Sequence, residues 1–391
     1  MNFQSKYYTL NDTKIGRKII SNVFSTLSNE FHSEQLRPIQ KFYKMSSLLP
    51  TEPLVDQTIL SFIQKLDDEF VLGKNAEKTC TMDEWLMFFA WDVIAQLTFS
   101  RPMGFIEAGG DQAGFLTTAN KALDYFATIG QMPFLDKLLA KNPVYPIGPP
   151  SWNDAAGFCA QQNIARQQKL SKGDFKESGQ RDMLDDFLEA KRHYPEIFDD
   201  SSIVGALLVN VLAGADTTGI LLRAIIYYVL KNPRVHRKLQ KELDEVGLSI
   251  PVSYVADSKL NYLDAVIKEA CRVHPGVGLL LERVVPESGL TLPDGRFLPQ
   301  GTTVGMNAWI VHQNKAIFGQ DAESFNPDRW LKNIEEGETV EEWQERVQRM
   351  KAADLTFGAG NRVCLGKNIS ILETYKVIPS LFLVYDVSIS R

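Results

Sequence analysis

The chain has 391 residues, of which 44% are hydrophobic and 23% are charged, as is typical of a folded globular protein. Its formal net charge is −6 and like charges do not cluster, so a nucleic-acid partner is not expected. The cysteines form no Cys-x-x-Cys pair, which argues against a disulfide framework and favours a reducing compartment. A chain of this length can bury one large core, and we expect a single domain over residues 1–391.

Apolar residues recur at helical spacing through much of the first two-thirds of the chain. The pattern predicts an amphipathic helix over residues 58–72 and a mostly buried helix over residues 83–99. A proline cluster then predicts a loop over residues 132–150 rather than a linker between domains. Residues 1–17 are polar and lack the apolar core of a signal peptide.

A polar start signal at residues 199–202 precedes a long apolar run that ends at an Asn-Pro pair, residues 232–233. A helix over this span would have roughly 30 residues and a length of about 45 Å. The run is also long enough to cross a membrane. Asp216 and Arg223 interrupt it, and a charge near the centre of a bilayer is costly, so a buried helix is favoured over a membrane span.

Helices are predicted next over residues 234–245 and 260–273, where apolar positions again follow a helical period. Residues 290–297 then predict a hairpin that turns at an Asp-Gly pair, and residues 302–306 predict one more strand. The predicted fold class is therefore mainly α with small β elements in the last third of the chain.

The middle of the long helix reads Ala-Gly-Ala-Asp-Thr-Thr over residues 213–218. Gly214 in a helix interior costs about 1 kcal/mol relative to alanine, so we expect a packing or functional reason for it. Small neighbours let a bulky group approach the backbone, and Asp216 beside Thr217 could organise water and relay protons. The alternative from these residues alone is a glycine that packs against another helix, with a solvated aspartate next to it.

Glu269 and Arg272 are three residues apart on one predicted helix face, so their side chains can pair. Their neighbours are apolar, which predicts that both are buried and need further partners. Arg329, in a proline-containing loop, is a candidate partner.

Residues 357–366 read Phe-Gly-Ala-Gly-Asn-Arg-Val-Cys-Leu-Gly. A glycine-rich loop can bring backbone N–H groups close to the Cys364 sulfur and stabilise a thiolate, which is a metal ligand. The guanidinium of Arg362 suits a carboxylate, such as a haem propionate. A cysteine thiolate is one of the few axial ligands of haem iron.

This loop resembles the haem-binding loop FxxGxRxCxG of the cytochrome P-450 family at every defined position. Residues 213–218 are similar to the AGxDTT segment of that family's long distal helix, and Glu269-x-x-Arg272 to its ExxR motif. These motifs occur in the family's order, and the resemblance covers about residues 25–380. It implies the cytochrome P-450 fold.

The resemblance implies haem b as the cofactor, with Cys364 as its axial thiolate and metal ligand. It implies that Arg362 pairs with a propionate, that Phe357 shields the sulfur, and that Gly360 and Gly366 allow the tight loop. Asp216 and Thr217 would be catalytic residues that deliver protons during O₂ activation. The remaining motif residues would form a buried network needed for folding and haem retention: Glu269, Arg272 and Arg329.

Three more basic residues are candidate haem contacts. Arg283 is either a surface arginine at a strand edge or, by the resemblance, a propionate contact with an apolar substrate wall beside it at residues 277–279. Residues 31–38 resemble the start of the family's propionate-binding helix, whose pattern is Trp-x-x-x-Arg. His32 stands at the tryptophan position and Arg37 is the nearest basic residue, so we expect both as haem contacts.

The implied activity is that of a haem-thiolate monooxygenase, which inserts one oxygen atom from O₂ into an apolar small molecule. The subgroup implied is the fungal microsomal, pisatin demethylase-like type, which acts in secondary metabolism or detoxification. Electrons would come from NADPH through a separate NADPH–cytochrome P-450 reductase, because this chain shows no flavin or dinucleotide motif. We expect a monomer at the endoplasmic reticulum membrane surface or, without a membrane-spanning segment, in the cytoplasm.

Little chain precedes His32 or follows Cys364 for a member of this family. We therefore expect a chain truncated at both ends, without the N-terminal anchor, the first sheet and part of the C-terminal hairpin. Two alternatives follow: a truncated, non-catalytic haem-binding paralogue, and a reductase-independent haem-thiolate isomerase or peroxide-driven oxidase.

Overall fold

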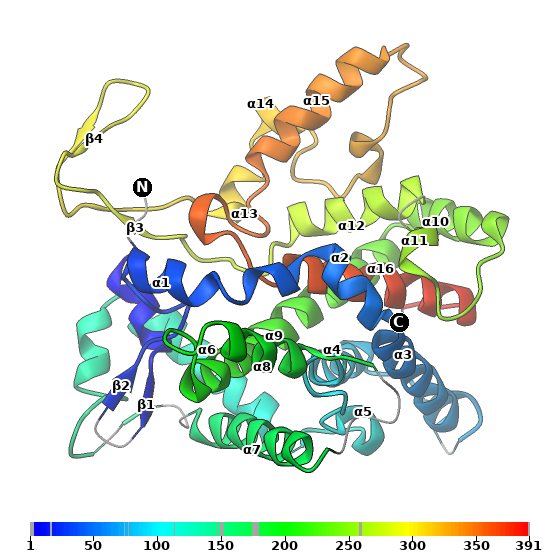
Figure 1. Ribbon diagram of the computed structural model, residues 1–391. Helices are drawn as coiled ribbons and strands as arrows, with labels where there is room; N and C mark the ends of the chain where they lie inside the picture. The colour runs from blue at the N-terminus through cyan, green and yellow to red at the C-terminus, as the bar shows by residue number, and fades with distance from the viewer. Residues whose placement is uncertain are drawn as a thin grey trace. The chain divides into compact units, whose positions relative to one another are not determined.

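Helices dominate the chain in a computed structural model that describes residues 4–15, 18–73, 75–76, 78–112, 114–145, 147–148, 152–173, 180–257 and 260–389 (Figure 1). This confirms the prediction of a mainly α fold with small β elements. The chain forms two compact units, each assembled from three stretches of sequence. The first unit comprises residues 1–47, 94–213 and 281–305, and the second comprises residues 48–93, 214–280 and 306–391.

The first unit holds three small antiparallel sheets, each of two strands. They pair β1 (Thr13–Ile15) with β2 (Lys18–Ile20), β3 (Arg283–Val284) with β6 (Thr303–Val304), and β4 (Leu290–Thr291) with β5 (Phe297–Leu298). Thr13 lies opposite Ile20, and Arg283 lies opposite Val304. The predicted hairpin is the β4–β5 pair, whose turn places Gly295 at φ +86°, where glycine is favoured.

Around these sheets, the first unit is helical. Its helices and 3₁₀ turns are η1 (Lys6–Asn11), α1 (Asn29–Leu36), η2 (Gln40–Tyr43), α5 (Phe105–Ala108), α6 (Phe115–Ile129), η5 (Pro133–Lys137), α7 (Asn153–Ser171) and α8 (Met183–His193). The short α2 (Met45–Leu48) lies at the boundary of the unit.

One buried ion pair, between Asp182 and Arg166, links three segments of the first unit. Asp182 is fully buried at the start of α8, where it accepts the backbone N–H of Asp185 in a capping box. Arg166 of α7 donates to both Asp182 oxygens, at 3.1 and 2.8 Å, and to the carbonyl of Phe99 at 3.2 Å. The guanidinium therefore links α7 to the start of α8 and to residue 99.

Two long helices, α4 (Met82–Phe99) and α9 (Asp200–Lys231), contribute to both units. Both match the predicted spans closely. Among the described residues, α9 is the helix whose length and composition would allow it to cross a membrane, and half of its most apolar window is buried inside the fold. Such a helix is also typical of a protein core, and Leu207 and Leu222 of α9 are fully buried.

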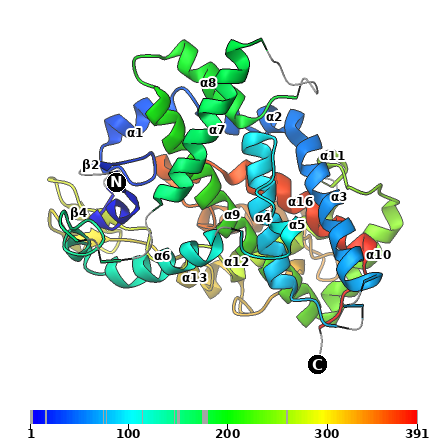
Figure 2. The same cartoon turned by 90° about the horizontal axis from the view of Figure 1, so that it is seen from below.

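The second unit contains the other helices. They are η3 (Leu49–Thr51), α3 (Glu52–Leu66), a π-helical turn η4 (Asp67–Val71), α10 (Pro233–Val246), α11 (Tyr254–Asp257), α12 (Asn261–Val273), α13 (Ala308–Val311), α14 (Lys315–Phe318), η6 (Pro327–Trp330), α15 (Val340–Ala353), η7 (Gly360–Arg362) and α16 (Lys367–Val384). α16 packs against both α3 and α10 (Figure 2).

The predicted helix over residues 58–72 has different ends in the structure. It begins at Glu52, and α-helical geometry stops at Leu66, before the π-helical turn. Pro53 lies in its first turn, where proline costs no hydrogen bond.

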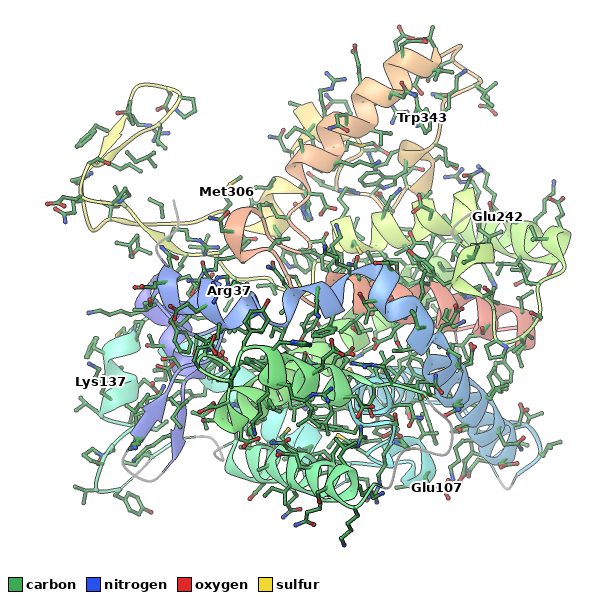
Figure 3. The ribbon with its side chains drawn as sticks, in the orientation of Figure 1. Arg37, Glu107, Lys137, Glu242, Met306 and Trp343 are labelled. Atoms are coloured by element: carbon green, nitrogen blue, oxygen red, sulfur yellow. The ribbon has the colours of Figure 1, made fainter. Side chains whose placement is uncertain are left out.

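α12 begins without a cap of its own and takes one from a neighbour. The carboxylate of Glu242 on α10, labelled in Figure 3, accepts the backbone N–H groups of Tyr262 and Leu263 at 2.8 and 2.9 Å. These are N–H groups of the first helical turn, which have no partner within the helix. α10 therefore fixes the first turn of α12, the helix that carries Glu269 and Arg272.

α16 buries two ionisable side chains in contrasting ways. Lys376 is 1% exposed and donates to Glu52 at 2.6 Å, with Asp56 2.8 Å away. Glu373 is fully buried, and neither of its carboxyl oxygens has a hydrogen-bond partner among the described residues. Burial raises the pKa of Glu373 well above its usual value, although the nearby Thr218 hydroxyl acts in the opposite direction. Burial therefore favours the neutral carboxylic acid form of Glu373.

Replacing Glu373 with glutamine should change how stability depends on pH. The unfolded wild-type chain releases this proton above about pH 4.3, whereas the folded chain keeps it, so the free energy of unfolding of the wild type falls as pH rises. The Glu373→Gln side chain does not ionise, so this fall in the free energy of unfolding is absent from the variant. Its stability relative to wild type should rise by up to about 1.4 kcal/mol per pH unit between about pH 5 and pH 7, measured by chemical denaturation.

The matched control is Glu335→Gln, which changes an exposed glutamate of the second unit. It should leave the pH dependence unchanged. A constant stability difference between Glu373→Gln and wild type across this pH range would show that Glu373 is not held neutral.

Candidate functional site

The predicted haem-binding loop lies between α15 and α16 in the second unit. It starts with a turn in which the Gly358 N–H donates to the Leu355 carbonyl at 2.9 Å. Gly358 and Gly360 have φ values of +73° and +68°, which favour glycine. The Cys364 N–H then donates to the Phe357 carbonyl at 2.8 Å, which closes the loop just before α16.

Gly366, the other glycine of the predicted loop, differs from Gly360. Its φ is −80°, which any residue can adopt. A Cβ built on Gly366 or on Gly360 would meet no protein atom within 4 Å. The protein therefore leaves space next to each of these glycines.

The sulfur of Cys364 is solvent-accessible and lies at the start of α16. Desolvation by the surrounding protein raises the pKa of the Cys364 thiol, although backbone N–H groups of Gly366 and Lys367 act in the opposite direction. These N–H donors suit a thiolate, the form that a bound metal ion imposes. The Lys367 ammonium also covers the Phe357 ring, 5.4 Å from its centre.

The other cysteines are less accessible. Cys80 is half-buried, and Cys159 and Cys271 are buried. Burial raises the pKa of Cys80 to about 11 and that of Cys159 to about 12, and it also raises the pKa of Cys271. Cys364 alone among the four combines an accessible sulfur with N–H donors at the start of a long helix.

The Ala-Gly-Ala-Asp-Thr-Thr segment has one accessible face on α9. Ala213 and Thr217, one helical turn apart, are exposed, whereas Ala215 and Thr218 are buried. Asp216 is half-buried, and desolvation raises its pKa to about 6. The carboxyl group is therefore partly desolvated, which differs from the freely solvated aspartate of the alternative interpretation.

The indole of Trp91, on α4, is a partner of Asp216 that the sequence alone did not indicate. Trp91 is fully buried, and its N–H lowers the pKa of Asp216, as does the charge of Arg223. These two groups partly offset the desolvation. Only the fold brings Trp91 beside Asp216, because their helices are far apart in the sequence.

The segment after α12 passes close to Thr217. A Cβ on Gly276 would lie 3.8 Å from the Thr217 carbonyl oxygen and 3.9 Å from its Cβ. Asn307 donates to the Gly278 carbonyl at 3.0 Å and helps to hold this segment. After Gly276 the segment carries exposed apolar side chains, with exposed fractions of 46% for Val277 and 37% for Leu279.

Glu269, Arg272 and Arg329 meet as the sequence predicted. Glu269 is fully buried and accepts two hydrogen bonds from Arg272, at 2.9 and 2.7 Å, and one from Arg329 at 2.9 Å. Its remaining acceptor positions receive the Asn326 N–H at 2.8 Å and the Trp330 indole N–H at 2.9 Å. A buried ion pair is stable only when its remaining donors and acceptors are matched, and here they are.

Arg272 uses its other donors to fix the loops that follow α12. It donates to the backbone carbonyls of His312 at 2.7 Å, Ala322 at 2.5 Å and Ser324 at 2.8 Å. An apolar cluster packs against the network: Ala265, Phe318, Ala322, Trp330, Val347 and Met350. Trp343 of α15, labelled in Figure 3, donates its indole N–H to the Trp330 carbonyl at 3.1 Å.

The other predicted haem contacts lie in the first unit, apart from Arg362 in the second. His32 is on α1, and Arg37 caps the end of that helix just before Pro38. Arg37 is labelled in Figure 3. Its guanidinium lies 5.7 Å from the centre of the Tyr194 ring. Arg283 is on β3, where it is half-buried and donates to the Tyr8 hydroxyl at 2.9 Å.

Comparisons with known proteins agree with the motifs. The family model "Cytochrome P450" matches residues 9–391. A cytochrome P450 monooxygenase, cfoH of Aspergillus candidus, is 39% identical over 98% of this chain and 70% of its own length. A cytochrome P450 monooxygenase of Aspergillus terreus is 40% identical over 95% of this chain and 74% of its own.

A third relative, cytochrome P450 monooxygenase cicH of Emericella nidulans, is 39% identical over 99% of this chain and 76% of its own. The family uses haem with a cysteine thiolate ligand, takes electrons from a redox partner, reacts with O₂ and is generally membrane-associated in fungi. The pisatin demethylase-like subgroup stays a prediction. The chain belongs to the cytochrome P450 family and is a haem-thiolate monooxygenase.

Proposed function

We propose that Cys364 is the axial thiolate ligand of haem b in this monooxygenase, and that Asp216 and Thr217 supply protons for O₂ activation. The observation that supports the ligand assignment is the accessible Cys364 sulfur, with N–H donors from the start of α16. The free space beside Gly360 and Gly366 suits a large planar group. When bound, the haem supplies the iron that binds and activates O₂.

Basic residues of this chain would hold the propionates. Arg362, two residues from Cys364, is the first candidate, because a guanidinium binds a carboxylate through two parallel hydrogen bonds. His32, Arg37 and Arg283 are the others. His32 and Arg37 are five residues apart, about 140° around a helix, so they lie on different sides of α1.

The proton chemistry would begin at the Asp216 carboxyl group. With a pKa raised to about 6, about a tenth of the Asp216 carboxyl groups carry a proton at neutral pH, so the group exchanges protons readily with water. The exposed Thr217 hydroxyl accepts a proton and passes on its own. Trp91 would orient the carboxyl group, and the small side chain of Ala213 leaves the adjoining helix face open.

We propose an apolar small molecule as the substrate, because the segment that passes Thr217 at Gly276 continues with exposed apolar side chains: Val277, Leu279 and Leu280. NADPH–cytochrome P450 reductase would be the electron donor, and a role in fungal secondary metabolism fits the fungal sources of the relatives. We propose that the enzyme works as a monomer.

We also propose that the first unit rests on the membrane of the endoplasmic reticulum. We call the exposed residues of β2 and of the loop after η5 the apolar patch: Ile19, Ile20, Leu138, Val144, Tyr145 and Ile147. Lys14 of β1, the partner strand of β2, donates to the Asn142 carbonyl at 2.5 Å and so ties the hairpin to the loop after η5. Lys137, labelled in Figure 3, is exposed beside the patch and could meet lipid phosphates.

Cys364→Ala should abolish thiolate ligation. The measurement is the reduced CO difference spectrum, in which a thiolate ligand gives a red-shifted Soret band. Wild type should show this band, and the variant should lose it even where haem still binds. Cys80→Ala, which removes a half-buried thiol, should keep the band. A wild-type protein that is folded and haem-loaded but lacks the red shift would refute the ligand assignment.

Asp216→Asn and Thr217→Val should separate NADPH consumption from product formation. Without the acid or the hydroxyl, proton delivery to the site of O₂ activation is slower. More of the electrons taken from NADPH then reduce O₂ to hydrogen peroxide instead of forming product. Product formation should fall about 100-fold in Asp216→Asn, measured as product and peroxide per NADPH.

Two control variants test this proton role. Asp244→Asn, on the exposed face of α10, should match wild type, as should Thr218→Val in its coupling ratio. Unchanged coupling in both Asp216→Asn and Thr217→Val would remove these residues from the mechanism.

Replacing Val144 and Tyr145 with aspartate should weaken membrane binding. Each side chain buries apolar area in the interface, so the double variant should bind vesicles of phosphatidylcholine and phosphatidylserine at least about tenfold more weakly in a flotation assay. The double variant of Val71 and Leu72, an exposed apolar pair in the second unit, is the control. Equal losses in both double variants would show that the patch has no special role.

A further inference from the structure

His312 is a fully buried residue at the end of α13 to which the sequence patterns assign no role. Its ring Nδ1 lies 3.0 Å from the carbonyl oxygen of Arg272, and its Nε2 lies 2.8 Å from the backbone nitrogen of Leu355. Its own carbonyl accepts the Arg272 guanidinium at 2.7 Å. The residue therefore makes three hydrogen bonds to two segments that are distant in the sequence.

These contacts fix the protonation of the ring. The Leu355 N–H is a donor, so Nε2 must offer its lone pair, and the Arg272 carbonyl is an acceptor, so Nδ1 must carry the hydrogen. Desolvation lowers the pKa of His312, and the Arg272 charge lowers it further, against an opposing effect of Asp354. The ring is a neutral bridge in one tautomer.

The bridge joins the buried network to the start of the cysteine loop. On one side is Arg272, which pairs with Glu269. On the other side is Leu355. Its carbonyl accepts the Gly358 N–H in the turn that starts the loop carrying Cys364. A second, longer contact runs in parallel, from the Thr356 hydroxyl to the Cys271 carbonyl at 3.4 Å. The entry of the loop is thus hydrogen-bonded to the end of α12.

We propose that His312 is a positioning residue for the haem ligand: its ring fixes the backbone at Leu355 and thereby the placement of the Cys364 sulfur. The proposal rests on the proposed role of Cys364. Without the bridge, the loop entry loses its hydrogen bond, and the buried Leu355 N–H and Arg272 carbonyl are left unsatisfied. Haem would still bind, but a larger fraction would lack thiolate ligation.

The test compares three variants by haem content and by the reduced CO difference spectrum. His312→Phe keeps an aromatic ring but removes both hydrogen bonds, and the thiolate-ligated fraction should fall several-fold. His312→Gln supplies one amide donor and one acceptor, and it should restore most of that fraction. His193→Phe, at an exposed position on α8, is the control and should match wild type.

Either of two results would overturn the proposal. One is a thiolate-ligated fraction in His312→Phe equal to that of wild type. The other is a His312→Gln variant that is folded and loaded but no better than His312→Phe, because the hydrogen bonds would then not matter. If wild type itself showed no thiolate band, the result would instead refute the assignment of Cys364 as the haem ligand.

A measurement on the unmodified protein covers the case in which the variants do not fold. In ¹⁵N-histidine spectra of the CO-bound wild type, one ring should show a slowly exchanging Nδ1–H and an unprotonated Nε2. The absence of such a ring would contradict the bridge.

Discussion

The buried carboxylate of Glu269 is the constraint on which much of the second unit depends. It accepts hydrogen bonds from Arg272, Arg329, Asn326 and Trp330, so its charge is matched without water. Removing any one partner would leave a desolvated charge or donor behind, which is far more costly than never burying the pair. The loops around it are therefore held in one arrangement, and the cysteine loop takes its position from them.

Three carboxyl groups of this unit show how environment decides chemical role. Glu269 is paired with guanidinium groups and serves structure. Glu373 is buried without a partner among the described residues and is held neutral. Asp216 lies between these extremes. Desolvation raises its pKa to about 6, although the Trp91 indole N–H acts in the opposite direction. Only the last is suited to exchanging protons near neutral pH.

The sequence predicted the motif residues better than it predicted the residues that hold those motifs in place. The cysteine loop and the Glu269–Arg272 pair could be predicted because each depends on residues close together in the chain. The bridge made by His312 and the contact of Trp91 with Asp216 could not, because apolar periodicity says nothing about which distant segments meet. The helix that begins at Glu52 was predicted to begin at residue 58, because the prediction followed the apolar stripe rather than the helix start. The roles of His32, Arg37 and Arg283 at the haem stay predictions.

The exposure of Cys364 has a consequence for the chemical labelling of the protein. Cys80 is half-buried, and Cys159 and Cys271 are buried, so alkylating agents should reach Cys364 before the other three cysteines. Cys364 is also the proposed haem ligand. Bound haem would cover its sulfur, so the rate at which Cys364 is alkylated would measure the haem-loaded fraction of a preparation.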